Sequence, residues 1–172
     1  VLAAVLDGGE SARLATDMVR GSQIAAQADA GYSLHSRFDG LFTLDATPSR
    51  GKKVSEVEKA LREQVERIKK TPPSNEELDR VKAQVVAGTV YEKDSIFYQA
   101  MQLGGVVTSG MDWRVIDQYL EKVRAITPEQ VQNAAKKYLT EDRLTIAELD
   151  PLPNEHGGHH APSSPAIQGI RH

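Results

Sequence analysis

Histidine is the residue type that a catalytic zinc site would need most, and its distribution in this chain is uneven. The sequence holds 5 histidines, of which only His35 lies before residue 156. A catalytic zinc helix carries two histidines on one face with a glutamate beside one of them, as in H-E-x-x-H or H-x-x-E-H. Neither pattern occurs in the sequence. We therefore predict no metal site and no catalytic residue in this chain.

The other histidines gather near the end of the sequence, in the segment His156-Gly-Gly-His159-His160 and at His172. Their imidazoles could bind a divalent ion loosely. Metal-binding histidines are normally oriented by a second shell of hydrogen bonds, and a segment rich in Pro, Gly and Ser does not predict one. We therefore interpret residues 152–172 as a disordered tail and not as a metal site.

Composition excludes several further classes of function. The chain has no cysteine, which rules out disulfides, thiol catalysis and cysteine-ligated zinc. Its formal net charge of −3, from 21 basic and 24 acidic residues, does not predict a nucleic-acid partner. No apolar run approaches the roughly 20 residues that span a bilayer. The sequence contains neither a G-x-S-x-G elbow nor a glycine-rich phosphate loop.

Arg20 is the first side chain that we single out for binding. It falls at the end of a predicted short helix and just before a predicted strand. A guanidinium there could hold a peptide carbonyl or a carboxylate through its paired N–H groups. It could equally offset the partial negative charge at the helix C-terminus. The spacing favours the second role but leaves the first one open.

The elements around Arg20 are expected to be two short helices followed by a β-hairpin. Residues 1–6 are typical of a buried helix that ends at Asp7-Gly8-Gly9, and Ser11 can cap a second helix over residues 12–19. Residues 25–34 then alternate and predict a strand, with residues 41–47 as its partner. The inward face of the first strand is predicted to carry Ala26, Ala28, Ala30, Tyr32 and Leu34.

Helices follow the hairpin, and their starts are well marked. Val54 to Ile68 gives one apolar stripe, and Ser74 and Thr127 each begin a capping box. The helix after Ser74 is expected to reach about residue 91, or to continue with a break through residues 94–105, and a further helix is expected over residues 113–123. Residues 143–149 alternate again and predict a last strand. This order predicts an α+β domain over residues 1–151, with an antiparallel sheet packed against helices.

Four motifs, taken in order, resemble the non-zinc halves of zinc peptidases of the pitrilysin/insulinase family. Residues 6–14, L-D-G-G-E-S-A-R-L, resemble the family's L-G-G-G-x-S-S-R-L, and residues 74–78 resemble S-x-E-E-L. Residues 126–131 resemble I-T-x-E-D-V, and residues 135–139 resemble A-x-K-Y-L. The resemblance covers the chain from Val1 to about Pro151.

The resemblance implies a two-layer half-domain that faces a homologous half carrying H-x-x-E-H and zinc. This chain would be the inactive C-terminal half, with no cofactor of its own. Its partners would be a peptide substrate and the zinc-bearing half, either in the same polypeptide or as a separate subunit. In active members the non-zinc half often supplies an Arg and, seven residues on, a Tyr. Arg20 matches the Arg, whereas Gln27 stands at the position of the Tyr. The resemblance therefore implies substrate binding by Arg20 and Gln27.

The resemblance also allows a second function, and some properties stay open. A family member that has lost both catalytic sets would serve as a non-enzymatic peptide-binding or complex-assembly subunit, and Gln27 in place of Tyr favours that reading. In either case we expect a peptide to bind by adding a strand to the sheet edge. Because residues 1–6 begin inside a helix without an initiator Met, we expect further residues upstream. The compartment stays open, and a periplasmic or secreted location is compatible with the resemblance.

Overall fold

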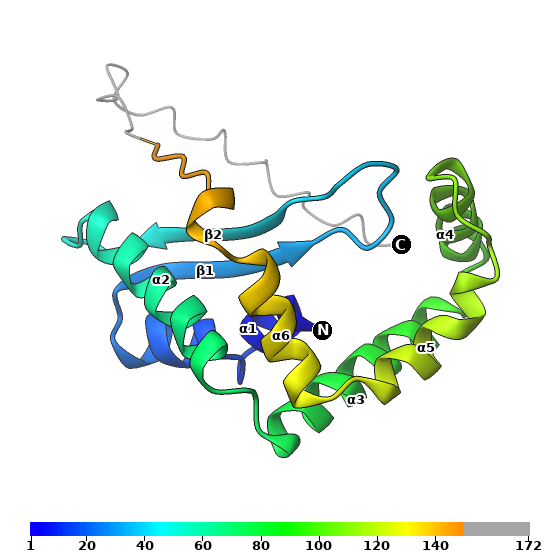
Figure 1. Ribbon diagram of the computed structural model, residues 1–172, viewed down its shortest axis with the longest axis horizontal. Coiled ribbons are helices and arrows are strands. Elements are labelled where there is room, and N and C mark those ends of the chain that lie inside the picture. Colours follow the sequence, from blue (N-terminus) through cyan, green and yellow to red (C-terminus); the bar gives the residue numbers. More distant parts are fainter. Residues whose placement is uncertain (150–172) are drawn as a thin grey trace, which may run out of the picture.

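The computed structural model describes residues 1–149. Helices dominate these residues, and one β-hairpin accompanies them. In chain order the elements are α1 (Leu2–Asp7), the π-helix η1 (Ala15–Gly21), β1 (Ala25–Tyr32), β2 (Phe42–Pro48), α2 (Val54–Lys70), α3 (Asn75–Glu92), α4 (Ile96–Thr108), α5 (Val115–Ala125), α6 (Pro128–Tyr138) and the 3-10 turn η2 (Glu141–Arg143). The hairpin forms one layer, and α1, α2 and α6 pack beside it as the second (Figure 1). The α+β class with an antiparallel sheet on helices is thereby confirmed.

The two strands pair in antiparallel fashion from Ala25 opposite Pro48 to Tyr32 opposite Phe42. The register shifts between Ala25 and Gln27, which leaves Ala26 as an extra residue in β1. Such a bulge resets the alternation of side chains along a strand. Ala25 and Ala28 are therefore buried, whereas Ala26 is exposed. The prediction that Ala26 faces inward is wrong for this reason.

The same prediction also fails at the far end of β1. Tyr32 is 56% exposed and Leu34, which lies beyond the last paired residue, is 53% exposed. The packed helices end before this part of the hairpin, which projects beyond them (Figure 1). Alternation in the sequence therefore marks which residues share a face, but it does not mark how far the core extends.

The strand predicted at residues 143–149 is absent from the structure. Residues 141–143 form the turn η2, and residues 144–149 follow it without pairing to another strand of the described chain. Leu144, Ile146 and Leu149 are 47%, 48% and 85% exposed. Alternating apolar residues favour a strand, but a strand exists only where a neighbour supplies hydrogen bonds. The hairpin does not supply them here, so this prediction is wrong.

The helix starts that the sequence marked at Ser74 and Thr127 are confirmed, whereas Ser11 makes no capping bond within residues 1–149. The Ser74 hydroxyl accepts the Glu77 N–H at 3.1 Å at the start of α3. Thr127 and Gln130 form both bonds of a capping box at the start of α6, at 3.0 and 3.3 Å. The helix expected over residues 12–19 is instead largely the π-helix η1. Ser22 stabilises its wider turn, because its N–H and its hydroxyl both donate to the Asp17 carbonyl, five residues back.

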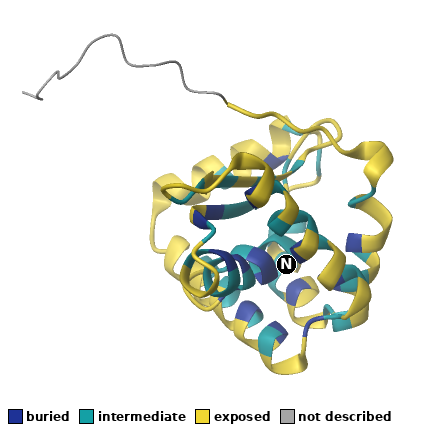
Figure 2. Ribbon diagram, turned by 90° about the vertical axis from the view of Figure 1, so that its left-hand side faces the viewer, coloured by how far each residue is buried: buried dark blue, intermediate teal, exposed yellow. Residues whose placement is uncertain are grey.

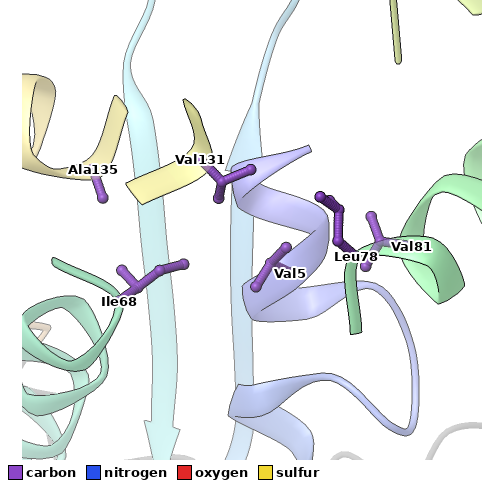
Figure 3. Close-up of a cluster of buried hydrophobic side chains, with 6 residues drawn as sticks. All are labelled: Val5, Ile68, Leu78, Val81, Val131 and Ala135. Atoms are coloured by element: carbon purple, nitrogen blue, oxygen red, sulfur yellow. The ribbon is translucent and has the colours of Figure 1, made fainter. Parts of the chain in front are cut away.

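Two clusters of buried apolar side chains hold the hairpin and its helices together. The first joins α1, α2, α3 and α6 (Figure 3) and consists of Val5, Ile68, Leu78, Val81, Val131 and Ala135. The second joins α1, η1, β1 and α2 and consists of Leu6, Leu14, Met18, Ala25, Ala28 and Val57. We call the part of the chain that these clusters unite, residues 1–85 and 126–143, the body.

Residues 86–125 form a helical arm that extends from the body (Figure 1). The arm comprises the end of α3 and all of α4 and α5. At its base the Lys82 ammonium donates a hydrogen bond to the Arg124 carbonyl at 2.9 Å. A break at residues 93–95 separates α3 from α4, as one of the two expectations had it. Buried residues gather in the body (Figure 2). In α4 Val106 is the only buried residue. Of the helices in residues 1–149, none has the length and apolar character that crossing a bilayer requires.

Candidate functional site

Arg20 lies in the last turn of η1, where its side chain is 52% exposed. Its Nη1 atom lies 3.3 Å from the Glu10 carboxylate, and its Nη2 atom donates to the Glu10 carbonyl. Neither bond goes to a carbonyl of its own helix. The guanidinium is therefore held by the glycine turn that precedes η1, in an ion pair with an acid that is itself 92% exposed.

This ion pair is weak enough to be exchanged. Exposed pairs of this kind contribute about 0–1 kcal/mol, because water screens them and both side chains lose freedom. A carboxylate or carbonyl of a bound peptide could therefore replace Glu10 at little cost. The backbone that carries Arg20 is held in place by Asp17 of the same π-helix. The Asp17 carboxylate accepts hydrogen bonds from Gln64 at 3.2 Å and from Arg67 at 2.5 Å, both on α2.

Gln27 lies on β1 directly after the bulge and opposite Thr47. Its side chain is exposed, and its Nε2 donates to the Asp29 carboxylate at 2.8 Å. The turn between η1 and β1 is fixed by the bond from the Ile24 N–H to the Met18 carbonyl at 3.0 Å. Each candidate side chain is thus held by its own acid, and no hydrogen bond joins Arg20 to Gln27 in the described structure.

The glycine turn at residues 7–10 positions β1 relative to α1. The Asp7 carboxylate accepts the Ala30 N–H at 3.1 Å, which occupies part of the outer edge of β1. A Cβ on Gly8 would lie 2.3 Å from the Ala4 carbonyl oxygen, and Gly9 has a φ of +101°. Only glycine fits both positions without strain. The turn that resembles a family motif therefore has a structural role that its residues explain.

A second feature joins two of the motifs that carry the resemblance. Arg13 in residues 6–14 binds Glu77 in residues 74–78 through two bonds of 2.7 and 2.8 Å, and the two side chains are only 12% and 16% exposed. The hydrogen bonds from Arg13 hold the pKa of the Glu77 carboxyl below its ordinary value, although partial burial opposes this. Arg80 adds a bond to the Ser11 carbonyl at 3.2 Å.

Sequence reasoning missed this pair, although both residues stood in motifs that we compared with the family. The two partners lie 64 positions apart, so no local spacing connects them. A paired, doubly bonded arginine and glutamate with little exposure is typical of a structural ion pair. We assign no chemistry to it.

The described residues form no metal-binding cluster. Among residues 1–149 no three histidine, aspartate or glutamate side chains lie close enough to hold a metal ion. An open hollow of about 250 Å³ lies beside the start of β1 and is lined by Ile24, Glu56, Lys59, Ala60 and Glu63, without Arg20 or Gln27. The histidines from His156 onward, and the predicted tail at residues 152–172, lie outside the described residues.

Comparison with known proteins places these features in a family. Residues 1–85 match the family described as the peptidase M16 inactive domain. That segment contains the glycine turn, both candidate site residues and the Arg13–Glu77 pair. No curated protein matches the sequence significantly.

Solved structures share the fold at low sequence identity. A "putative zinc protease" from Bordetella pertussis Tohama I is 24% identical, covers 88% of this chain and 82% of its own, and has a TM-score of 0.76. The inactive peptidase domain of a "putative zinc protease" from Bordetella parapertussis is 23% identical, covers 90% of this chain and 83% of its own, and has a TM-score of 0.74.

A third solved structure shows the same fold within a much longer chain. A protease from Helicobacter pylori is 20% identical and covers 83% of this chain at a TM-score of 0.76. This chain spans only 34% of the length of that protease. The resemblance seen in the sequence motifs and the family match on residues 1–85 agree, and the absence of the zinc motif agrees with the family's description. Residues 1–85 thus belong to the peptidase M16 inactive domain family, and the chain shares the fold of these solved proteases.

Proposed function

We propose that this domain is the non-catalytic half of a zinc metallopeptidase and supports a peptide substrate opposite a zinc-bearing half. In this proposal Arg20 binds a carbonyl or carboxylate of the peptide, and Gln27 donates a hydrogen bond from its side-chain amide. The partner half carries H-x-x-E-H and the zinc ion. The chain described here takes no chemical step itself.

The observation that carries the proposal is the exposure of Arg20 within the family match. Both candidate residues lie in residues 1–85 and both are exposed. The backbone below Arg20 is anchored to α2 through Asp17, while its guanidinium is held by Glu10 alone, through the exposed carboxylate and the backbone carbonyl of that residue. A preorganised backbone with an exchangeable side-chain partner suits the binding of a ligand that replaces Glu10.

Zinc does not fit the residues of this chain that the structure describes. The described part lacks a cluster of ligands, and the sequence lacks both zinc motifs. We therefore place the metal in the partner half, where it would activate water. The contribution of this domain is positioning: charge from Arg20, a neutral donor from Gln27, and the surface that closes over the peptide.

An extended peptide would bind by adding a strand to an outer edge of the sheet. The outer edge of β1 is partly occupied by the bond from Ala30 to Asp7, so the outer edge of β2 is the better candidate. Pro48 closes β2 at one end because it has no N–H to donate. Protection of β2 amides from hydrogen exchange by a fluorescein-labelled casein peptide would support this, whereas protection confined to the helices would contradict it.

The experiment that tests the proposal is peptide hydrolysis with added zinc. We expect no hydrolysis by this chain alone and hydrolysis when it is combined with the zinc-bearing half. Arg20→Ala should then lower kcat/KM roughly 10-fold to 100-fold, the range expected for a charged hydrogen bond. Arg114→Ala is the matched control, because Arg114 is an exposed arginine that also binds a nearby acid, Asp112 at 3.0 Å.

Two results would contradict the proposal. Hydrolysis by the chain alone that a chelator abolishes would show that it holds a metal site of its own. Equal kcat/KM for Arg20→Ala and Arg114→Ala would remove Arg20 from the substrate site. If no combination hydrolyses the peptide, the second function, a non-enzymatic peptide-binding or assembly subunit, is favoured instead. The exposed apolar surface of the helical arm also favours that function.

A further inference from the structure

The outer surface of α4 is apolar and uncharged, and the body does not cover it. Helix α4 contains no charged residue along Ile96–Thr108. At 3.6 residues per turn, eight of the eleven exposed residues of α4 occupy an arc of roughly 160°, whereas the exposed Tyr98, Gln99 and Gly105 lie outside it and the buried Val106 lies on the far side of the helix. We call this arc the α4 face. Its members are Ile96, Phe97, Ala100, Met101, Leu103, Gly104, Val107 and Thr108.

The α4 face is large enough to support association. Its five large side chains, Ile96, Phe97, Met101, Leu103 and Val107, are 85%, 74%, 59%, 45% and 53% exposed. At roughly 200 Å² for each fully exposed side chain they present about 600 Å². The largest apolar patch of an ordinary monomer is about 300–600 Å². With the small residues between them the face approaches the roughly 800 Å² per partner of a standard interface.

We propose that the α4 face is a homodimer interface, in which α4 of one copy packs on α4 of a second copy across a two-fold axis. The area it offers approaches what a stable dimer needs, and the absence of charge is typical of homodimer interfaces, which are more apolar than other protein contacts. This proposal concerns the arm and goes beyond the substrate-binding role of the body.

The order of residues on the face is compatible with its own copy. Ala100, Gly104 and Thr108 recur every fourth residue along its middle, with Ile96, Leu103 and Val107 on one side and Phe97 and Met101 on the other. A two-fold axis near Gly104 would seat the large side chains of each helix beside the small row of the other. Such self-complementarity is the requirement of an isologous interface.

A membrane surface fits the α4 face less well than a second copy does. Helices that lie on membranes carry lysine and arginine on their polar side. The segments that flank α4 instead balance Lys93 against Asp94 and Arg114 against Asp112. The formal net charge of the chain, −3, also does not favour anionic lipid.

Glycine 104 makes the proposal testable without disturbing the fold. A Cβ at Gly104 meets no atom within 4 Å, so a larger side chain is tolerated in one copy. Gly104→Leu should strengthen the isolated helix, since leucine is a better helix former than glycine, yet it blocks close approach of two helices. Gly88→Leu is the matched control, because Gly88 is also helical, exposed and open around its Cβ.

Light scattering after size exclusion gives the mass in solution. We expect the wild-type chain and Gly88→Leu at twice 18.8 kDa, and Gly104→Leu at 18.8 kDa with undiminished helix content by circular dichroism. Phe97→Glu should also be monomeric, while Phe38→Glu, the same change at an 80% exposed phenylalanine of the hairpin loop, should stay dimeric.

Cross-linking provides a second, independent readout, because the natural chain has no cysteine. Under mild oxidation Gly104→Cys should form a covalent dimer, and Gly88→Cys should not. A wild-type mass of 18.8 kDa up to the highest soluble concentration would overturn the proposal and leave the α4 face for a different partner, such as the zinc-bearing half. A dimer that persists in both Gly104→Leu and Phe97→Glu would overturn it as well.

Discussion

In the body, Leu6, Leu14 and Ile68 have no solvent exposure, whereas in the helical arm Ile96 and Phe97 are 85% and 74% exposed. Both regions are built from helices with similar capping, as Ser74 and Ser95 show with their bonds of 3.1 and 3.2 Å. They differ in what their apolar residues contact. The body packs them into two clusters, while α4 turns most of them to solvent (Figure 2). Local helix signals therefore do not determine whether a helix completes a core.

The comparison predicts the largest effects for leucines of the body. Leu14→Ala removes a fully buried side chain and should lower the free energy of unfolding by about 3 kcal/mol. Leu103→Ala, at a leucine of α4 that is 45% exposed, should lower it by less than about 1 kcal/mol. Urea unfolding at low protein concentration, followed by circular dichroism, measures both. Equal losses would show that the arm is packed as firmly as the body.

Replacing a glycine by alanine should destabilise the body but stabilise the arm. Gly8→Ala places a Cβ 2.3 Å from the Ala4 carbonyl oxygen and should destabilise the body by about 2 kcal/mol. Gly88→Ala meets no atom within 4 Å and should stabilise α3 by about 0.5–1 kcal/mol. Thermal unfolding of the two variants gives the test. A loss of stability in Gly88→Ala would mean that the arm has a close neighbour at that point.

The Arg13–Glu77 pair predicts a pH-dependent effect in the body. Because the pKa of Glu77 is lower in the folded chain than in the unfolded chain, its charged form stabilises the fold above the ordinary glutamate pKa, and this stability is lost as pH falls through the lowered value. Glu77→Gln should cost about 1.5 kcal/mol at pH 7. The difference from wild type should shrink as pH falls below about 4.5.

The neighbouring Glu76 provides the control for that prediction. It lies in the first turn of the same helix and is exposed. Glu76→Gln should change the unfolding free energy by less than about 0.5 kcal/mol at any of these pH values. Urea unfolding at pH 7, 5, 4 and 3 on the wild type and both variants distinguishes them. Parallel curves for wild type and Glu77→Gln would exclude the pair as the source.

The smallest effect is expected at the candidate binding residue. Arg20→Ala removes an exposed ion pair with Glu10 and should change stability by no more than about 0.5 kcal/mol. Differential scanning calorimetry should therefore give nearly the wild-type Tm. A drop of several degrees would show that Arg20 holds the glycine turn in place, and any loss of hydrolysis in that variant would then reflect folding.

Features set by neighbouring residues were predictable from the sequence, and features set by distant contacts were not. The starts of α3 and α6 followed from Ser74 and Thr127, because a capping side chain acts within three residues. The alternation at residues 143–149 predicted a strand that has no partner in the described structure. The bulge at Ala26 could not be predicted from local sequence either, because it depends on the pairing of β1 with β2.

The candidate site divides in the same way. The position of Arg20 at a helix end singled it out, and motif order then led to the family, whose pattern added Gln27. The roles of both residues as substrate contacts stay predictions. The acids that hold these side chains, Glu10 and Asp29, were not anticipated. The Arg13–Glu77 pair was missed because a separation of 64 positions leaves no local signal.

The bond from the Lys82 ammonium to the Arg124 carbonyl, 2.9 Å long, brings together two points that are 42 positions apart in the chain. Val81, which precedes Lys82, and Val131, which follows Arg124 in the next helix, pack in the same buried cluster. The polypeptide thus leaves the body and returns to it at nearly the same place, which is the geometry of a tolerated insertion. We therefore expect that a short linker from α3 to α6 could replace the arm without unfolding the body.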